Sequence, residues 1–153
     1  KYTYLGITTI PFWKRRKVWL KLDDSEGQII DFTMFAATTG ETFGGGYTVC
    51  PGVSPVDNDG MIMYAPRLSR IAMLSLMGPM KKGKHIGKWG ITMQKANRIE
   101  IKPVDSNGEV SDVPLPLSTW VQADGEPIIL SPATLEWHTG QLLVRGAADV
   151  PWA

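Results

Sequence analysis

The sequence predicts a mainly all-β fold, an antiparallel β-sandwich with one or two short helices. The 16 glycines and 11 prolines are spread along the chain as turn-forming residues instead of being gathered in a linker. The segments between them are short and rich in β-branched and aromatic residues, which favour strands. Only one segment has the three-and-four spacing of apolar residues that is typical of a helix. Many strands, one clear helix and short turns together favour a sandwich.

Two strands joined by a short turn begin the predicted sheet. Residues 17–23 alternate polar and apolar side chains, which places Val18, Leu20 and Leu22 on one face of a half-buried strand. A turn rich in acidic residues and glycine follows, and residues 28–37 then form a longer strand. Further strands are expected at residues 48–50, 60–65, 91–101, 120–123, 135–138 and 142–144.

One helix interrupts the strands. Apolar residues recur at steps of three and four in residues 68–77, with Pro66 before them and Gly78-Pro79 after them as start and stop signals. Residues 104–118 carry Asn107-Gly108 and several prolines, so we expect a long exposed loop or an irregular hairpin there.

The composition fits one globular domain over residues 1–153. A content of 43% hydrophobic and 20% charged residues excludes a collagen-like or disordered chain. A formal net charge of +1 gives no support for nucleic acid as a partner. The one cysteine, Cys50, cannot form an internal disulfide, so we expect a reducing compartment and a cytoplasmic protein. With only two histidines beside it, Cys50 is also too isolated for a zinc cluster.

Three turn-like segments carry candidate chemistry, each with a simple structural alternative. Gly44-Gly45-Gly46 either forms a bulge or sharp bend or lets a ligand approach the backbone closely. Asp57-Asn58-Asp59-Gly60 is rich in oxygen ligands for a hard cation such as Mg²⁺, or is a plain turn. Asp124-Gly125-Glu126 places two acids where one can accept a proton from a hydroxyl, or is an ordinary Asp-Gly turn.

Two basic stretches lie next to aromatic residues. Lys14-Arg15-Arg16-Lys17 follows Phe12-Trp13, and Lys81-Lys82-Gly83-Lys84 precedes Trp89. This combination suits the anionic face of a membrane, whereas the net charge disfavours nucleic acid. The alternative is a solvated surface. We therefore expect a protein that is cytoplasmic and, where these stretches contact lipid, peripheral at the membrane.

An ordered set of segments resembles the carboxyl-terminal domain of the diacylglycerol kinase and sphingosine kinase-like lipid kinase family. The resemblance runs from about Val18 to Val144, and its segments are residues 43–46, 51–62, 68–70, 83–85 and 121–127. Enzymes of this family join an α/β domain with a Gly-Gly-Asp-Gly motif to a carboxyl-terminal β-sandwich. This sequence contains no Gly-Gly-Asp-Gly. The resemblance therefore implies the second domain of a longer kinase, inactive without its nucleotide-binding domain.

The resemblance also implies roles for individual residues. Glu126 takes the position of the general base on the lipid hydroxyl, and Asp124 lies beside it to orient the turn. Asp59 would ligate a Mg²⁺ ion together with the backbone carbonyls of Val56 and Met61.

The resemblance also assigns substrate binding to the glycine triplet and to the residue that precedes Gly40. These are Gly44, Gly45, Gly46 and Thr39, and Thr39 stands where the family usually has Asn. The co-substrate ATP would be bound mainly by the missing domain, and the lipid would be a diacylglycerol or a sphingoid base. Two other functions stay open. One is a free-standing β-sandwich module whose six tryptophans stack on a sugar or peptide, and the other is an NAD kinase-like domain.

Overall fold

The computed structural model describes residues 2–14, 16–115, 120–129 and 132–138. Two α-helices, two short 3₁₀ helices and ten strands follow one another in this part of the chain. They are α1 (Tyr2–Thr9), η1 (Ile10–Phe12), β1 (Arg16–Leu22), β2 (Gln28–Thr38), β3 (Thr42–Phe43), β4 (Tyr47–Thr48), β5 (Gly60–Pro66), α2 (Arg70–Lys81), η2 (Lys88–Gly90), β6 (Thr92–Ala96), β7 (Arg98–Pro103), β8 (Trp120–Ala123), β9 (Glu126–Ile129) and β10 (Ala133–Glu136).

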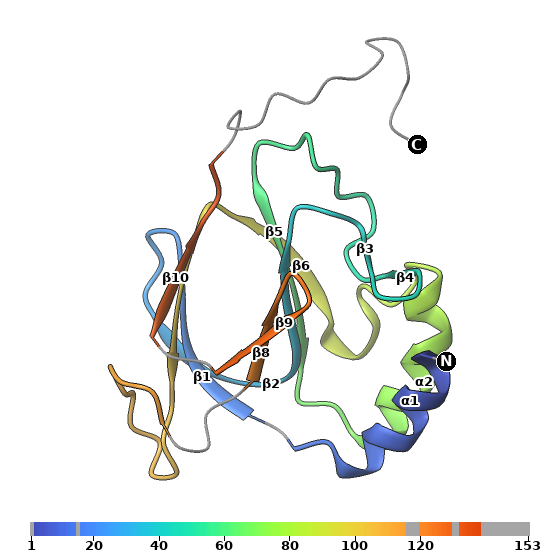
Figure 1. Cartoon of the computed structure of the whole chain (residues 1–153), viewed down its shortest axis with the longest axis horizontal. Helices are drawn as coiled ribbons and strands as arrows, with labels where there is room; N and C mark the ends of the chain where they lie inside the picture. Colours follow the sequence, from blue (N-terminus) through green and yellow to red (C-terminus); the bar gives the residue numbers. More distant parts are fainter. Residues whose placement is uncertain (1, 15, 116–119, 130–131, 139–153) are drawn as a thin grey trace.

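Six antiparallel strands form the main sheet, in the order β10-β7-β1-β2-β5-β6. The first half of β2 pairs with β1 and the second half pairs with β5, with a register shift between Phe32 and Met34. Strands β6 and β7 are separated in sequence only by Asn97, although three strands lie between them in the sheet. The sheet therefore folds back on itself into two layers (Figure 1), which confirms the predicted sandwich-like, mainly β fold.

Apolar residues from both layers fill the space between them. Val18 and Leu20 of β1 and Ile99 of β7 meet Ile62 of β5 and Ala96 of β6 in one buried cluster. Val18 and Leu20 are the buried face that the alternation of residues 17–23 predicts.

Helix α2 covers the other face of the β2-β5-β6 layer. Its buried residues Ala72 and Leu76 pack with Met63 and Ala65 of β5 in a second cluster. Because side chains alternate along β5, Ile62 faces the inter-sheet core while Met63 faces the helix. The helices α1 and η1 lie beside α2 on this side of the molecule (Figure 1). Within the described residues, no helix has both the length and the apolar character needed to cross a bilayer.

The predicted helix is present but its bounds differ. It begins at Arg70 because the Ser69 side chain caps it, accepting a hydrogen bond from the backbone N–H of Ala72 at 3.1 Å. It continues past the predicted stop at Gly78-Pro79 to Lys81. Pro79 has no N–H to donate to the carbonyl of Ser75, so the helix continues past it with one hydrogen bond fewer in its last turn.

The predicted strand over residues 91–101 is wrong in one respect, because Asn97 divides it into β6 and β7. The backbone N–H groups of Asn97 and Arg98 both donate to Oδ1 of Asp23, each at 2.8 Å, and this contact occurs where the strand breaks. Asp23 is 74 residues away in sequence from Asn97, so no local pattern signals the break.

Smaller shifts affect the other elements. The strand expected at residues 48–50 is Tyr47–Thr48, the strand expected at 135–138 is Ala133–Glu136, and the strand expected at 142–144 lies outside the described residues. An isolated bridge between Val104 and Val110 makes the start of the 104–118 segment an irregular hairpin, as predicted. Helix α1 was not predicted, because its sequence lacks an apolar stripe with helical spacing.

Candidate functional site

The glycine triplet turns the chain between β3 and β4. Gly45 and Gly46 have φ angles of 75° and 78°, a region that strongly favours glycine. Glu41 ties this hairpin to the following turn, because its carbonyl accepts from the N–H of Cys50 and its carboxylate accepts from the N–H of Gly52, both at 3.1 Å. The sharp bend considered from the sequence is therefore present. Thr39 is exposed just before this hairpin.

Asp59 lies immediately before β5 and forms an ion pair that the sequence did not predict. Its Oδ2 accepts a hydrogen bond from Nζ of Lys95 at 2.8 Å. Lys95 on β6 is the register partner of Met61, so strand pairing brings the two charges together across 36 residues of sequence. This hydrogen bond lowers the pKa of Asp59 and raises that of Lys95.

The loop before β5 has the donor types that Mg²⁺ prefers, namely a carboxylate and backbone carbonyls. Val56 is exposed in this loop, whereas Met61 lies inside β5 between Thr38 of β2 and Lys95 of β6. No group of three or more His, Cys, Asp or Glu side chains gathers to hold a metal within the described residues. A cation bound here would therefore depend on Asp59 and carbonyl oxygens, and it would have to replace the Lys95 ammonium.

A close contact explains the glycine that follows Asp59. A Cβ atom on Gly60 would overlap the indole ring of Trp137. The backbone N–H of Trp137 in turn donates to the carbonyl of Asn97 at 3.0 Å. The Asp-Gly step is thus required by the packing of Trp137 against the start of β5.

Glu126 begins the second strand of a tight hairpin. Asp124 and Gly125, at φ angles of 47° and 93°, form the two-residue turn that joins β8 to β9, and positive φ at both positions is typical of a type I′ turn. Glu126 is exposed and pairs with Ala123. Val121 of the same hairpin packs against the inter-sheet core, which anchors the hairpin to the domain.

A cavity of about 640 Å³ lies between η1, α2 and the β2-β5-β6 layer. Its lining is mostly apolar and includes Met34, Met73, Met77 and Met80. The last three are spaced at i, i+4 and i+7 on α2, so they share one face of the helix. Sequence reasoning missed this stripe, although its spacing was visible. Methionine side chains adapt their shape readily, which suits a cavity for flexible apolar ligands.

Two of the segments singled out from the sequence meet at this cavity. Gly44 of the glycine triplet and Gln122 of the β8–β9 hairpin both contribute to its lining. Asp59, Val56 and Met61 do not line it, and the side chain of Asp59 pairs with Lys95. The structure thus associates the glycine turn with the Glu126 hairpin and places the Asp59 loop apart from the cavity lining.

Two side chains of reactive types, those of His85 and Cys50, are fully buried in the domain. Nε2 of His85 lies 3.0 Å from the carbonyl oxygen of Val49, and burial lowers the pKa of His85. Burial raises the pKa of the Cys50 thiol to about 11, so this thiol stays protonated at neutral pH. Both residues serve as parts of the packed interior.

Solved structures share this fold. A crystal structure of a proposed diacylglycerol kinase from Bacillus anthracis str. Sterne superposes with a TM-score of 0.60 at 19% identity, over 88% of this chain and 40% of that one. Another crystal structure of a diacylglycerol kinase from the same organism gives a TM-score of 0.59 at 19% identity, over 89% and 42%. The chain thus spans about two fifths of the length of these proteins.

The curated proteins offer no match to the chain. A family model does match, over residues 1–145, and it describes the YegS C-terminal NAD kinase beta sandwich-like domain. That span includes the folded-back sheet, the methionine-lined cavity and the Glu126 hairpin. A match over so much of the chain places it in the family of YegS C-terminal NAD kinase β-sandwich-like domains.

Proposed function

We propose that this domain is the lipid-binding part of an ATP-dependent lipid kinase of the diacylglycerol kinase type. The observation that carries the proposal is the apolar cavity of about 640 Å³, to which the β8–β9 hairpin contributes Gln122. Ligand cavities in proteins commonly measure about 300–1,000 Å³. Burial of each methylene group contributes about 0.8 kcal/mol of favourable free energy, so the transfer of an acyl chain from water into this methionine-lined cavity is favourable.

In this proposal, Glu126 accepts the proton of the lipid hydroxyl. The hydroxyl oxygen forms a bond to the γ-phosphorus of ATP while the bond from that phosphorus to the β–γ bridging oxygen breaks and ADP leaves. The proton passes to the Glu126 carboxylate. The type I′ turn of Asp124 and Gly125 holds Glu126 at a defined strand position, and an anchored strand aims a catalytic group better than a free loop does.

We further propose that Asp59 holds a Mg²⁺ ion with the carbonyls of Val56 and Met61. The ion would supply positive charge that offsets the carboxylate and keeps the loop before β5 in one position. Because Lys95 already pairs with this carboxylate, the ion would have to displace the Lys95 ammonium. ATP would be bound mainly by a nucleotide-binding domain of a cytoplasmic kinase.

A titration with a fluorescent short-chain diacylglycerol tests the proposal on this chain. We expect saturable binding, followed by probe anisotropy. Met77→Trp places a larger side chain in the cavity wall and should weaken binding at least tenfold, because the acyl chain loses its space. Leu74→Trp is the matched control, since Leu74 is on the same helix but is exposed and outside the cavity lining. Equal affinity of Met77→Trp and the unsubstituted chain would show that acyl chains do not use this cavity.

The alternative of a sugar- or peptide-binding module predicts exposed tryptophans aligned on one sheet face. Among the tryptophans whose side chains the structure describes, only Trp19 lies in a strand of the main sheet, and it is half-buried beneath Nζ of Lys102. The exposed Trp13 and Trp89 lie at the two 3₁₀ helices instead. This arrangement gives the module no support.

A further inference from the structure

The net charge of +1 conceals a strong separation of charges along the sequence. Residues 1–22 and 60–99 contain fourteen of the sixteen Lys and Arg residues and none of the fifteen Asp and Glu residues. The helices α1, η1 and α2 all belong to these two acid-free segments. The three helices therefore contribute positive charge only to the side of the molecule on which they lie together (Figure 1).

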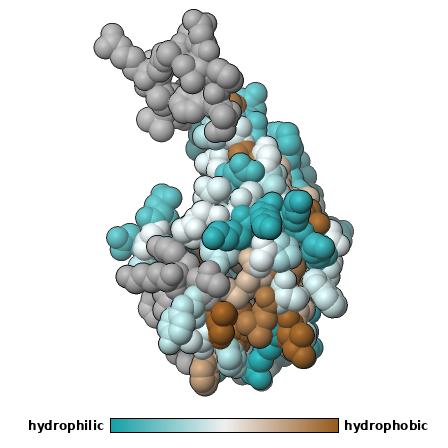
Figure 2. All heavy atoms as spheres, turned by 90° about the vertical axis from the view of Figure 1, so that its right-hand side faces the viewer, coloured by the Kyte–Doolittle hydropathy of each residue, from teal (hydrophilic) through white to brown (hydrophobic). Residues whose placement is uncertain are grey.

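The same helices expose large apolar side chains. Phe12 of η1 and Ile71 of α2 are each 81% exposed, and Tyr4, Ile7 and Leu74 are exposed as well. Figure 2 looks onto this side and shows hydrophobic side chains gathered beside hydrophilic ones. Exposed apolar side chains gathered in this way mark a contact surface for a membrane or another protein. We call the exposed residues of α1, η1 and α2, with Lys14, the helix face.

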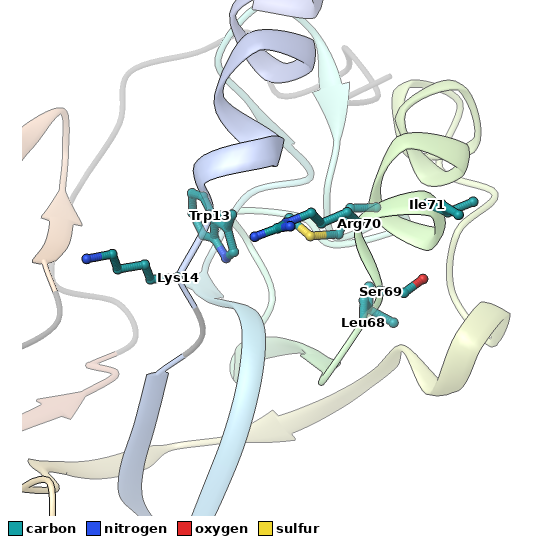
Figure 3. Close-up of a pocket in the computed structure, with 7 residues that line it drawn as sticks. Trp13, Lys14, Leu68, Ser69, Arg70 and Ile71 are labelled. Atoms are coloured by element: carbon teal, nitrogen blue, oxygen red, sulfur yellow. The ribbon is translucent and has the colours of Figure 1, made fainter.

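A hollow of about 630 Å³ lies between η1 and the start of α2 (Figure 3). In it, the side chains of Trp13 and Arg70 point toward one another, while Ile71 points away into solvent. Lys14 also contributes to the lining. Trp13 and Met73 line both this hollow and the methionine-lined cavity, so the two spaces adjoin. The helix face thus places two cationic side chains, Lys14 and Arg70, next to the apolar cavity.

From these observations we infer that the helix face docks on an anionic lipid bilayer, and that a lipid passes from the bilayer through the hollow into the cavity. The entry route rests on the proposed function, whereas the docking does not. Exposed aromatic and aliphatic side chains suit the membrane interface, and cationic side chains such as those of Lys14 and Arg70 suit anionic headgroups. A bilayer is favoured over a second copy of this chain, because two copies of a purely positive face would repel each other.

Vesicle sedimentation tests the docking. The chain should bind vesicles of phosphatidylcholine with phosphatidylglycerol far better than vesicles of phosphatidylcholine alone, and added salt should weaken this binding. Lys14→Gln with Arg70→Gln should weaken it by roughly twenty-five-fold, at about fivefold per charge. Phe12→Ser with Ile71→Ser should weaken it by at least about tenfold, because inserted apolar area is lost.

Matched controls carry the same changes elsewhere. Arg98→Gln removes a charge that is already paired with Glu100 and Glu136, and Val113→Ser removes an exposed apolar side chain from the 104–115 loop. Neither should change vesicle binding. Unchanged binding in both paired variants would overturn the docking. The docking would also be overturned if the Phe12→Ser, Ile71→Ser variant changed from dimer to monomer with no change in vesicle binding. The helix face would then be an interface between copies of the chain.

The soluble probe separates this inference from the proposed function. The helix-face variants should bind the fluorescent short-chain diacylglycerol as the unsubstituted chain does when no vesicles are present. If the paired variants changed neither probe binding nor vesicle binding, the docking would be refuted and the proposed lipid cavity would be unaffected. Lost probe binding in Met77→Trp, with vesicle binding intact, would support both the cavity and a separate docking face.

Discussion

Asp59 and Lys95 show how one ion pair controls what a loop can bind. Both side chains are at the surface, so their 2.8 Å contact adds little to stability. Its importance is chemical. The Lys95 ammonium donates a hydrogen bond to Oδ2 of Asp59, the oxygen atom that a divalent cation would need as a ligand. The binding of Mg²⁺ at this loop therefore becomes a competition between the metal and Lys95.

Lys95→Met should strengthen Mg²⁺ binding, because it removes the competing ammonium while keeping much of the side-chain volume. Titration calorimetry of the chain with Mg²⁺ would measure the change. Asp59→Asn should abolish the binding, and Lys102→Met, which removes a lysine paired with Asp112, should leave it unaltered. If Lys95→Met bound Mg²⁺ no better than the unsubstituted chain, Asp59 would be a turn residue and no metal ligand.

His85 should make stability depend on pH. Burial holds its pKa below the usual value near 6.5, and its Nδ1 has no partner within the described residues to receive a hydrogen bond from a second N–H. The neutral ring therefore stabilises the fold fully above pH 6.5. As the pH falls below 6.5, the unfolded chain takes up a proton that the folded chain resists, so stability decreases.

Urea unfolding at a series of pH values would measure this effect. His85→Gln keeps a donor for the Val49 carbonyl but cannot titrate, so its stability should vary less between pH 6.5 and lower values. His138→Gln should keep the full dependence, because His138 is exposed. The explanation fails if both variants lose stability with pH as steeply as the unsubstituted chain.

Glu126→Gln tests the proposed base. Glutamine keeps the shape of the side chain but cannot accept the proton, so kcat for lipid phosphorylation should fall by about 10²- to 10⁴-fold. The measurement requires a protein in which the proposed nucleotide-binding domain accompanies this domain. Folding should not change, because Glu126 is exposed. A variant with normal turnover would leave positioning as the main source of catalysis.

At the scale of elements, the sequence predicted what depends on neighbours in the chain. The alternation in β1, the helix predicted near residues 68–77 and the tight turn after β8 all follow from local patterns. The break at Asn97 depends on Asp23 from a distant strand end, which no local pattern contains.

The candidate site divides in the same way. The three turns were found from residue types. The Lys95 ion pair depends instead on the pairing of β5 with β6, and the contact of Trp137 with Gly60 arises only when the sheet folds back. The methionine stripe on α2 is a different case. Its spacing is visible in the local sequence, but only the folded structure shows that these side chains line a cavity.

Gly60→Ala should destabilise the domain by about 1–3 kcal/mol, because the added methyl group overlaps Trp137. The free energy of unfolding in urea would measure this cost. The cost should shrink in a chain that also carries Trp137→Ala. Gly78→Ala is the control, since its Cβ would meet nothing within 4 Å and alanine favours a helix. An equal cost for Gly60→Ala with and without Trp137 would show that the indole is not the obstacle.

The whole molecule combines a rigid sandwich with a helix layer that bounds the cavity. The folded-back sheet holds the β8–β9 hairpin through Val121, and α2 packs on the outer face of the same sheet. The apolar cavity lies between these parts, and the positively charged helix face lies outside it. Lipid binding and membrane contact would therefore occupy the same side of the domain.

The transfer of labelled phosphate tests the proposed lipid kinase activity most directly. An enzyme that joins this domain to its nucleotide-binding domain would be supplied with γ-labelled ATP, Mg²⁺ and either dispersed diacylglycerol or NAD. We predict that the label appears on the lipid, and that Met77→Trp reduces this transfer while Val113→Trp, a change at an exposed side chain outside both the cavity lining and the helix face, does not. Label on NAD, or equal transfer to the lipid by both variants, would contradict the proposal that this domain presents a lipid hydroxyl held by the methionine-lined cavity.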